Sequence, residues 1–248
     1  MLRDWDARTY DRVADPMARW GAGVLDRLPL AGDERVLDAG CGSGRVTELL
    51  ADRLPRGRVI ALDGSLAMIE AARERLATFG DRIEYVVADL ERPLPLAEPV
   101  DAVLSTATFH WVADHDALFA NLAAVIRPGG RLVAQCGGVG NIASVKRVLA
   151  TVGDDWLGPA HYETPMATVR RLDASGFVDI ECWLQDEPTW FEPGEPIETY
   201  LRTVILGAHL ERLPADERAG FVHEVAVRLP EPLIDYVRLN IVARRSSR

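Results

Sequence analysis

A short apolar strand that breaks into glycines, VLDAGCGSG at 36–44, restricts the possible folds more than any other part of the sequence. The apolar residues follow a charged segment, which is typical of a buried strand in a parallel sheet. Gly40, Gly42 and Gly44 then allow a sharp turn with positive φ angles, where a ligand can approach the backbone closely. The stretch therefore predicts a strand, a tight turn and a helix, the arrangement at which α/β proteins bind nucleotides.

A second strand, RVIALD, ends in a carboxylate at Asp63, about 20 residues after the glycines, where an acidic side chain can accept both hydroxyls of a ribose. A dinucleotide site prefers the spacing G-x-G-x-x-G, whereas these glycines are spaced G-x-G-x-G. Asp38 precedes the turn and would repel a pyrophosphate, but it suits a ligand with an ammonium group. The pattern favours S-adenosylmethionine, and a nicotinamide-dependent oxidoreductase stays open as an alternative.

Polar residues also follow the next two predicted strands. Asp89 and Leu90 end the strand that begins at Ile83, and Thr106 follows a strand over 101–105. Because parallel strands of an open α/β sheet present their carboxyl ends at one edge, these residues are expected beside Gly40 and Asp63.

Several motifs occur in order along the first half of the chain: WDARTYDRVAD, VLDAGCGSG, the end of VIALD, EYVVAD, DAVLSTATFHWV and RPGGRLVAQ. In this order they resemble the class I S-adenosylmethionine-dependent methyltransferases. Within that family the chain is most similar to the group that includes trans-aconitate methyltransferase and related small-molecule enzymes, on FHWV and the N-terminal motif.

The resemblance implies S-adenosylmethionine as cofactor, S-adenosylhomocysteine as product, and an N-terminal segment that folds over the cofactor. The cofactor-binding residues that it implies are Tyr10, Arg19, Asp38, Gly40, Gly42, Asp63, Gly64, Met68, Asp89, Leu90 and Thr106. Four histidines share no metal-ligand spacing, so no metal is expected: His115, His161, His209 and His223.

The expected fold class is α/β: a Rossmann-like, mostly parallel sheet with an antiparallel last strand, helices on both faces and a helical lid insertion. One domain is expected over 1–248. Its pattern predicts a helix over 66–79, a fifth strand over 131–136 after an Arg-Pro-Gly-Gly segment, and a strand-like stretch over 177–191. Its parts would be an N-terminal helical cover (1–32), a cofactor-binding core (33–192), the lid insertion (193–232), and a final strand with a tail (233–248). The insertion separates two predicted neighbouring strands, and connections of this length are often functional.

The formal net charge of −10 argues against a broad nucleic-acid surface, since phosphate binding needs a basic face. No apolar run is long enough to span a membrane. Three widely spaced cysteines suit reduced thiols in a cytoplasmic protein. The sequence therefore favours a cytoplasmic enzyme with a small-molecule acceptor, and it leaves the oligomeric state open.

His110 and Trp111 follow the fourth strand, where acceptor chemistry is expected. His110 can be a general base for a hydroxyl acceptor, a binding partner for a carboxylate, or a polar lining residue, and Trp111 can exclude water. We expect a small-molecule methyltransferase that acts by in-line displacement, and the resemblance implies that it esterifies a carboxylate. O- or C-methylation of a natural-product or quinone-type acceptor and a non-catalytic cofactor-binding module remain alternatives.

Overall fold

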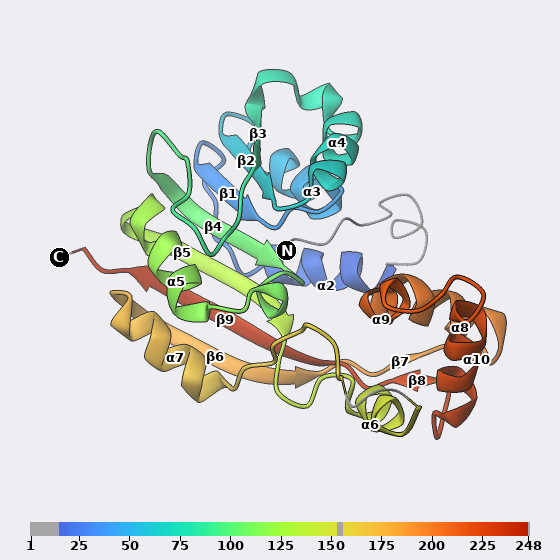
Figure 1. Ribbon diagram of the computed structural model, residues 1–248. Helices are drawn as coiled ribbons and strands as arrows, with labels where there is room; N and C mark the ends of the chain where they lie inside the picture. The colour runs from blue at the N-terminus through green and yellow to red at the C-terminus, as the bar shows by residue number, and fades with distance from the viewer. Residues whose placement is uncertain (1–14, 153–155, 248) are drawn as a thin grey trace.

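A seven-stranded sheet forms the centre of the structure, a computed structural model that describes residues 15–152 and 156–247 (Figure 1). The strand order is β3-β2-β1-β4-β5-β9-β6. The neighbours from β3 to β5 run parallel, and β9 lies antiparallel between β5 and β6. The expected class, a mostly parallel Rossmann-like sheet with an antiparallel last strand, is confirmed. The strands are β1 (Arg35–Ala39), β2 (Arg58–Asp63), β3 (Ile83–Val87), β4 (Val100–Thr106), β5 (Ile126–Gly137), β6 (Phe177–Asp186) and β9 (Val237–Arg245).

Helices cover both faces of this sheet because its central strands are apolar on both sides. Successive side chains of a strand point to opposite faces, so Val36 and Leu37 enter different cores. The core that contains Val36 packs against α2 (Asp15–Leu25), α3 (Arg45–Asp52) and α4 (Leu66–Arg75). The core that contains Leu37 packs against α5 (His115–Val125) and α7 (Pro165–Ala174).

Two elements begin or end away from their predicted positions. The helix predicted over 66–79 ends at Arg75, and a 3-10 helix, η1 (Ala77–Arg82), follows with Gly80 at φ 56°. The fifth strand begins at Ile126, before the Pro-Gly-Gly segment expected to precede it. An irregularity in the β4–β5 ladder between Val100 and Ala102 accommodates that segment.

The strand-like stretch predicted over 177–191 divides into two strands. β6 ends at Asp186, and β7 (Thr189–Trp190) pairs with β8 (Leu233–Ile234) in a separate two-stranded sheet. Pro188 lies at the break, where its missing N–H cannot extend a ladder.

A group of helices lies beyond the carboxyl ends of the parallel strands, between β7 and β8 in sequence (Figure 1). These are α8 (Glu195–Tyr200), the π-helical turn η3 (Leu201–Ile205), α9 (Gly207–Glu211) and α10 (Arg218–Arg228). With α6 (Ala143–Val152) they enclose a third apolar core, which Trp20 of α2 also enters. Within 15–152 and 156–247, no helix has the length and apolar character needed to cross a membrane.

Candidate functional site

The glycine turn after β1 packs tightly on one side and is open on the other. Gly40 and Gly42 have φ angles of 83° and 54°. A Cβ atom on Gly40 would lie 2.2 Å from the side chain of Thr108, whereas a Cβ on Gly42 would meet no atom of the described residues within 4 Å. The turn is therefore closed by the segment after β4 at Gly40 and faces open space at Gly42.

Asp38, the carboxylate before this turn, is buried with 1% of its surface exposed. Thr47 Oγ1 donates to its Oδ2 at 2.7 Å, and no group among the described residues donates to the buried Oδ1. Burial raises the pKa of Asp38 from 3.8 to about 7, the Thr47 hydrogen bond opposes the shift, and the charge of Asp63 adds to it. A buried carboxylate oxygen without a donor fits the cationic group of a ligand.

Asp63 joins the end of β2 to the glycine turn. Its Oδ2 accepts from Gly42 N, and its Oδ1 accepts from Ser65 N, both at 2.9 Å. Burial raises the pKa of Asp63, and the backbone hydrogen bonds from Ser65, Gly42 and Gly64 oppose this shift. Because an ionised carboxylate has about four lone-pair sites, Asp63 can accept ligand hydroxyls as well.

Three further predicted residues lie after β2 and β3. Met68 is buried in the first turn of α4. Asp89 Oδ1 accepts from Glu91 N at 2.9 Å, so this carboxylate caps the turn after β3. The carbonyl oxygen of buried Leu90 accepts from Asn121 Nδ2 at 3.0 Å. The structure thus places the apolar and acidic residues at the edge where the glycine turn lies.

Thr106 is the last residue of β4, and the chain then turns sharply through Ala107, which has a φ of 56°. The hydroxyl of Thr108 donates to Gly40 O at 3.1 Å, which fixes this segment to the glycine turn. The 3-10 helix η2 (Phe109–Trp111) follows directly. Thr108, two residues before His110, is therefore fixed to the glycine turn.

His110 is buried, and its Nδ1 accepts a hydrogen bond from the backbone N–H of Gly137 at 3.3 Å. The bond requires an unprotonated Nδ1, so a neutral ring carries its proton on Nε2. Burial lowers the pKa of His110 well below 6.5, and the charges of Arg238 and His115 lower it further. His110 is consequently a neutral imidazole with a donating Nε2–H.

Aromatic and basic side chains surround His110. The ring of Trp111, which is 37% exposed, lies 4.9 Å from the His110 ring, and the ring of Tyr162 lies 5.9 Å from it. Lys146 Nζ lies 4.3 Å from the centre of the Tyr162 ring. The sequence analysis missed Tyr162, Lys146 and Arg238. For Arg238 a signal existed, because it shares with Tyr236 and Asn240 one face of the predicted last strand.

Of the two N-terminal residues predicted to contact the cofactor, Tyr10 and Arg19, the structure describes only Arg19. Arg19 lies on α2 with an exposed side chain, while the next residue, Trp20, is buried. Tyr10 lies outside the described residues. Their contact with a cofactor stays a prediction.

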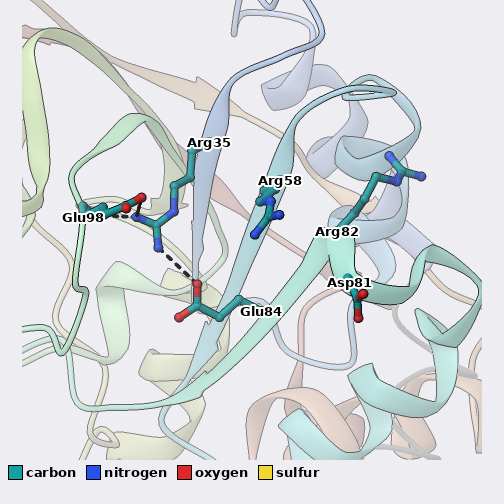
Figure 2. A pocket seen from close by; sticks show the side chains of 6 residues that line it. All are labelled: Arg35, Arg58, Asp81, Arg82, Glu84 and Glu98. Carbon is teal, nitrogen blue, oxygen red and sulfur yellow. Dashed lines mark hydrogen bonds and ion pairs between the residues drawn. The ribbon is translucent and has the colours of Figure 1, made fainter.

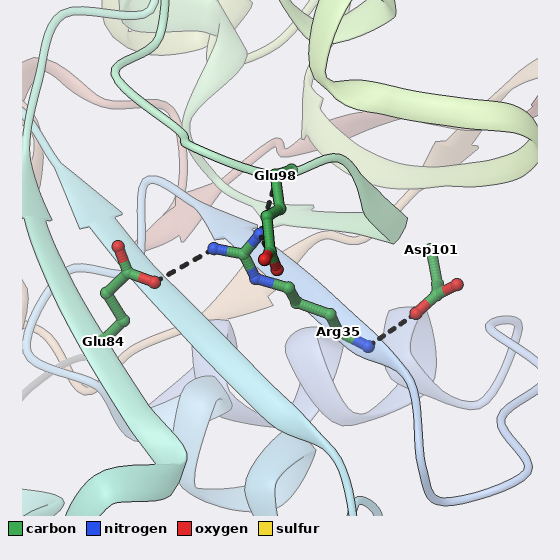
Figure 3. Close-up of polar contacts among 4 residues, drawn as sticks. All are labelled: Arg35, Glu84, Glu98 and Asp101. Carbon is green, nitrogen blue, oxygen red and sulfur yellow. Dashed lines mark hydrogen bonds and ion pairs between the residues drawn. The ribbon is translucent and has the colours of Figure 1, made fainter.

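A cavity of about 180 Å³ lies at the opposite edge of the sheet, near the first residues of β1 and β2 (Figure 2). Its lining is wholly charged: Arg35, Arg58, Asp81, Arg82, Glu84 and Glu98. Arg35 donates to Glu84 Oε2 at 3.1 Å and to Glu98 O at 2.7 Å, and its backbone N–H donates to Asp101 Oδ2 at 2.7 Å (Figure 3). These contacts join the starts of three strands, which is a structural role.

The cysteines and metal-ligating groups do not suggest other chemistry at the glycine turn. Burial raises the pKa of the Cys41 thiol well above 9.0, and the charges of Asp38 and Asp63 raise it further, so Cys41 is a protonated packing residue. Over the ranges 15–152 and 156–247, no three His, Cys, Asp or Glu side chains are grouped so as to hold a metal ion.

The sequence matches the methyltransferase domain family over residues 36–130. It is 30% identical over 278 residues to a trans-aconitate 2-methyltransferase of Paracidovorax citrulli, covering 99% of this chain and 100% of the relative. It is 28% identical over 264 residues to a trans-aconitate 2-methyltransferase of Variovorax paradoxus, with 99% and 100% coverage.

Solved structures show the same fold. A Haemonchus contortus phosphoethanolamine N-methyltransferase, in complex with phosphomonomethylethanolamine and S-adenosylhomocysteine, superposes with a TM-score of 0.64 at 20% identity. That alignment covers 98% of this chain and 57% of the other. The Bacillus protein YcgJ superposes with a TM-score of 0.68 at 15% identity, covering 92% and 99%.

These similarities exclude the nicotinamide-dependent and non-catalytic alternatives. The full-length match at 30% identity, the methyltransferase domain and the seven-stranded sheet agree. The chain belongs to the class I S-adenosylmethionine-dependent methyltransferases and is a small-molecule enzyme of the group that includes the trans-aconitate 2-methyltransferases.

Proposed function

We propose that this methyltransferase esterifies a carboxylate of a small organic acid. The observation that carries the proposal is the hydrogen bond from Gly137 N–H to His110 Nδ1. It occupies the only basic nitrogen of a neutral imidazole, so His110 donates through Nε2 and has no lone pair with which to remove a proton. The names of the full-length relatives, trans-aconitate 2-methyltransferases, support the same substrate class.

A carboxylate acceptor matches this site because it is already ionised near neutral pH. S-adenosylmethionine supplies an electrophilic methyl group, which passes to the acceptor oxygen as the carbon–sulfur bond breaks and S-adenosylhomocysteine leaves. The reaction requires no proton transfer. His110 Nε2–H is placed to donate to the carboxylate and orient it, and alignment of this kind contributes about 7 to 11 kcal/mol. Trp111 and Tyr162 limit the access of water.

The proposed cofactor site uses the residues at the carboxyl ends of β1 to β4. Asp38 binds the ammonium group, Asp63 accepts hydrogen bonds from the ribose hydroxyls, and Asp89 accepts one from the adenine amino group. The other residues approach the cofactor through their backbone, pack on adenine or cover it: Tyr10, Arg19, Gly40, Gly42, Gly64, Met68, Leu90 and Thr106. The open space at Gly42 and the unpartnered Asp38 oxygen support this assignment.

Asp63→Ala should weaken S-adenosylhomocysteine binding by about 1.5 to 3 kcal/mol, about 10- to 100-fold, because it removes a charged acceptor of hydroxyl hydrogen bonds. Isothermal titration calorimetry measures the change. Asp26→Ala is the control, since Asp26 is an exposed carboxylate paired with Arg53 on the surface. Equal affinity in wild type and Asp63→Ala would remove the ribose assignment.

His110 variants test the proposed acceptor class. With an acid acceptor, His110→Leu should lower kcat/KM about tenfold, the loss of one hydrogen bond, and His110→Gln should recover part of it through its N–H. Loss of a general base would instead cost about 10²- to 10⁴-fold. Because burial and Arg238 keep the pKa of His110 well below 6.5, kcat should be constant from pH 6 to 9.

The assay uses trans-aconitate, fumarate and glutarate, the monoacids crotonate and butyrate, and catechol as a phenolic comparison. Ester formation with an acid supports the proposal. Turnover of catechol alone, with kcat rising as His110 deprotonates, would contradict it. The aromatic rings of Trp111 and Tyr162 around His110 favour O- or C-methylation of a planar aromatic acceptor as the second candidate.

The remaining parts of the proposal concern the lid and the location. We propose that the helices from α8 to α10 form a wall over the acceptor, because they lie beyond the carboxyl ends of the strands and share a core with Trp20 (Figure 1). A cytoplasmic location is supported by the three cysteines, which are free thiols.

A further inference from the structure

The segment 161–163 connects the 3-10 helix that contains His110 with the residues that follow β5. The backbone N–H of His161 donates to His110 O at 2.8 Å. Two residues later, Glu163 O accepts from Val139 N at 3.0 Å, and Glu163 lies opposite Gly138 in an isolated parallel bridge. The backbone of this segment therefore holds η2 against the end of β5.

Tyr162, the middle residue of this segment, packs against both His110 and Gly137. The centres of the Tyr162 and His110 rings are 5.9 Å apart, and their planes differ by 33°. A Cβ atom on Gly137 would lie 2.7 Å from Tyr162 Cε1, so the Tyr162 ring occupies the space that a larger residue at 137 would need. Because Gly137 N–H donates to His110 Nδ1, Tyr162 adjoins both partners of this hydrogen bond.

The Tyr162 ring is itself held by two neighbours. A side-chain hydrogen bond from Asn141 opposes the burial that raises the pKa of Tyr162, so Asn141 donates to the hydroxyl oxygen. Asn141 is fixed in turn, since its Oδ1 accepts from Val237 N at 2.9 Å. Lys146 of α6 places Nζ 4.3 Å from the centre of the Tyr162 ring, where a cation is attracted by the ring face. Contacts with β9 and α6 thus set the orientation of Tyr162.

The neutral state of His110 depends mainly on its burial. Burial is the largest cause of its lowered pKa, and the charges of Arg238 on β9 and His115 on α5 add to it. Two neighbouring groups are uncharged at neutral pH, because burial raises the pKa of the Cys136 thiol to about 12 and also raises that of the Tyr162 phenol. Removal of the Tyr162 ring would admit water to His110 and weaken the largest of these causes.

We propose that Tyr162 is a positioning residue that keeps His110 in the orientation in which its imidazole donates through Nε2. Without the Tyr162 ring, the imidazole can rotate and lose the hydrogen bond from Gly137 N–H. The effect on catalysis rests on the proposed function, in which His110 orients the reacting carboxylate. The effect on His110 itself is independent of the reaction.

Nuclear magnetic resonance of ¹⁵N-labelled histidine rings tests the effect on His110 directly, with His110→Gln to assign its signals. In wild type, His110 should remain neutral with its proton on Nε2 from pH 6 to 8, because its pKa lies well below 6.5. In Tyr162→Ala, the pKa of His110 should rise toward 6.5 and both tautomers should be observed. Tyr162→Phe keeps the ring and should retain the wild-type state of His110.

Gly137→Ala displaces the Tyr162 ring without changing either aromatic residue. Gly137 does not have a positive φ, so alanine adds no left-handed strain there, and its Cβ would lie 2.7 Å from the ring. This variant should shift the His110 signals as Tyr162→Ala does. Tyr85→Ala is the matched control, because Arg73 Cζ lies 4.4 Å from the centre of the Tyr85 ring on β3, at the far edge of the sheet. It should leave the His110 signals unchanged.

Kinetics of a double variant test the effect on catalysis, with the acid that wild type methylates. Tyr162→Ala should lower kcat/KM by up to about tenfold, the loss expected for His110→Leu, because both act through one hydrogen bond. Adding Tyr162→Ala to His110→Leu should cost nothing further, whereas independent effects would multiply to about 100-fold. Calorimetry with S-adenosylhomocysteine establishes that each variant is folded.

Two results would overturn the proposal. One is an unchanged pKa and tautomer of His110 in folded Tyr162→Ala, or in Gly137→Ala if the alanine variant at 162 does not fold. The other is a loss of kcat/KM that multiplies in the double variant, which would show that Tyr162 acts on the acceptor by itself. If wild type methylates none of the acids, the proposed function fails, while the nuclear magnetic resonance experiment still decides whether Tyr162 positions His110.

Discussion

Asp38→Asn should weaken the binding of S-adenosylhomocysteine about 10²- to 10⁴-fold. The substitution keeps the size of the side chain and its acceptor for the Thr47 hydroxyl, but it removes the charge that we propose to face the cofactor ammonium. Removing one partner of a buried ion pair costs about 3 to 5 kcal/mol, because the other charge is left uncompensated. Isothermal titration calorimetry at pH 8, where wild-type Asp38 is ionised, measures the loss.

A truncated ligand provides the control for this experiment. 5′-Methylthioadenosine keeps the adenosine part of the cofactor and lacks the amino acid part, so its affinity should be the same in wild type and Asp38→Asn. An equal loss for both ligands would show that Asp38 organises the glycine turn instead of binding the ammonium group.

The pKa of Asp38 makes the same variant informative about stability. Burial raises this pKa from 3.8 to about 7, so between these pH values the native state binds more protons than the unfolded state. The stabilisation from protonated Asp38 is complete below the lower value and is lost as the pH rises through about 7. In ligand-free melts from pH 5 to 8, the Tm of Asp38→Asn should therefore rise relative to that of wild type. A difference that does not change with pH would contradict the assignment.

Gly40→Ala should destabilise the fold by about 2 to 5 kcal/mol, the second large effect. Left-handed backbone costs a residue with a Cβ about 1 to 2 kcal/mol, and the new Cβ would also lie 2.2 Å from the Thr108 side chain. Thr108 cannot rotate away without losing its hydrogen bonds to Gly40 O and Thr106 O. Overpacking of this kind adds about 1 to 3 kcal/mol. Urea denaturation measures the free energy of unfolding.

Gly42→Ala is the matched control, because Gly42 also has a positive φ and a Cβ there would meet no atom of residues 15–152 or 156–247 within 4 Å. It should cost only the backbone strain of about 1 to 2 kcal/mol, while it lowers cofactor affinity by filling open space. The double variant Gly40→Ala with Thr108→Gly should recover the part of the unfolding free energy that overpacking removes. Equal losses of unfolding free energy for the two alanine variants would refute the packing argument.

The sequence predicts the strands whose ends form the proposed cofactor edge, because the information for each of them is local. The strand before Gly40, the strand before Asp63 and the helix that begins after Ser65 are each set by a few consecutive residues, and their common edge follows from parallel pairing. The fold class could also be predicted, because the order of strands and helices along the chain is compatible with only a few topologies.

The acceptor side could not be predicted in this way, because it depends on contacts between distant residues. The state of His110 is set by the N–H of Gly137, and the place of Arg238 is set by the β5–β9 ladder. Tyr162 reaches His110 from a loop without periodic pattern. The irregular β4–β5 ladder was likewise not predictable, since it depends on the partner strand. For the break between β6 and β7 a signal existed in Pro188, which the sequence analysis did not use.

The place of β9 between β5 and β6 has a consequence for biosynthesis. This strand is the last in sequence order, yet it fills an interior position and carries Arg238. During translation β5 and β6 therefore leave the ribosome with exposed edges that must await a strand from the end of the chain. The glycine turn and Asp63 can assemble earlier from the first four strands. Nascent enzyme would then form the proposed cofactor edge before the proposed acceptor site, and only a chain synthesised through β9 would be competent for turnover.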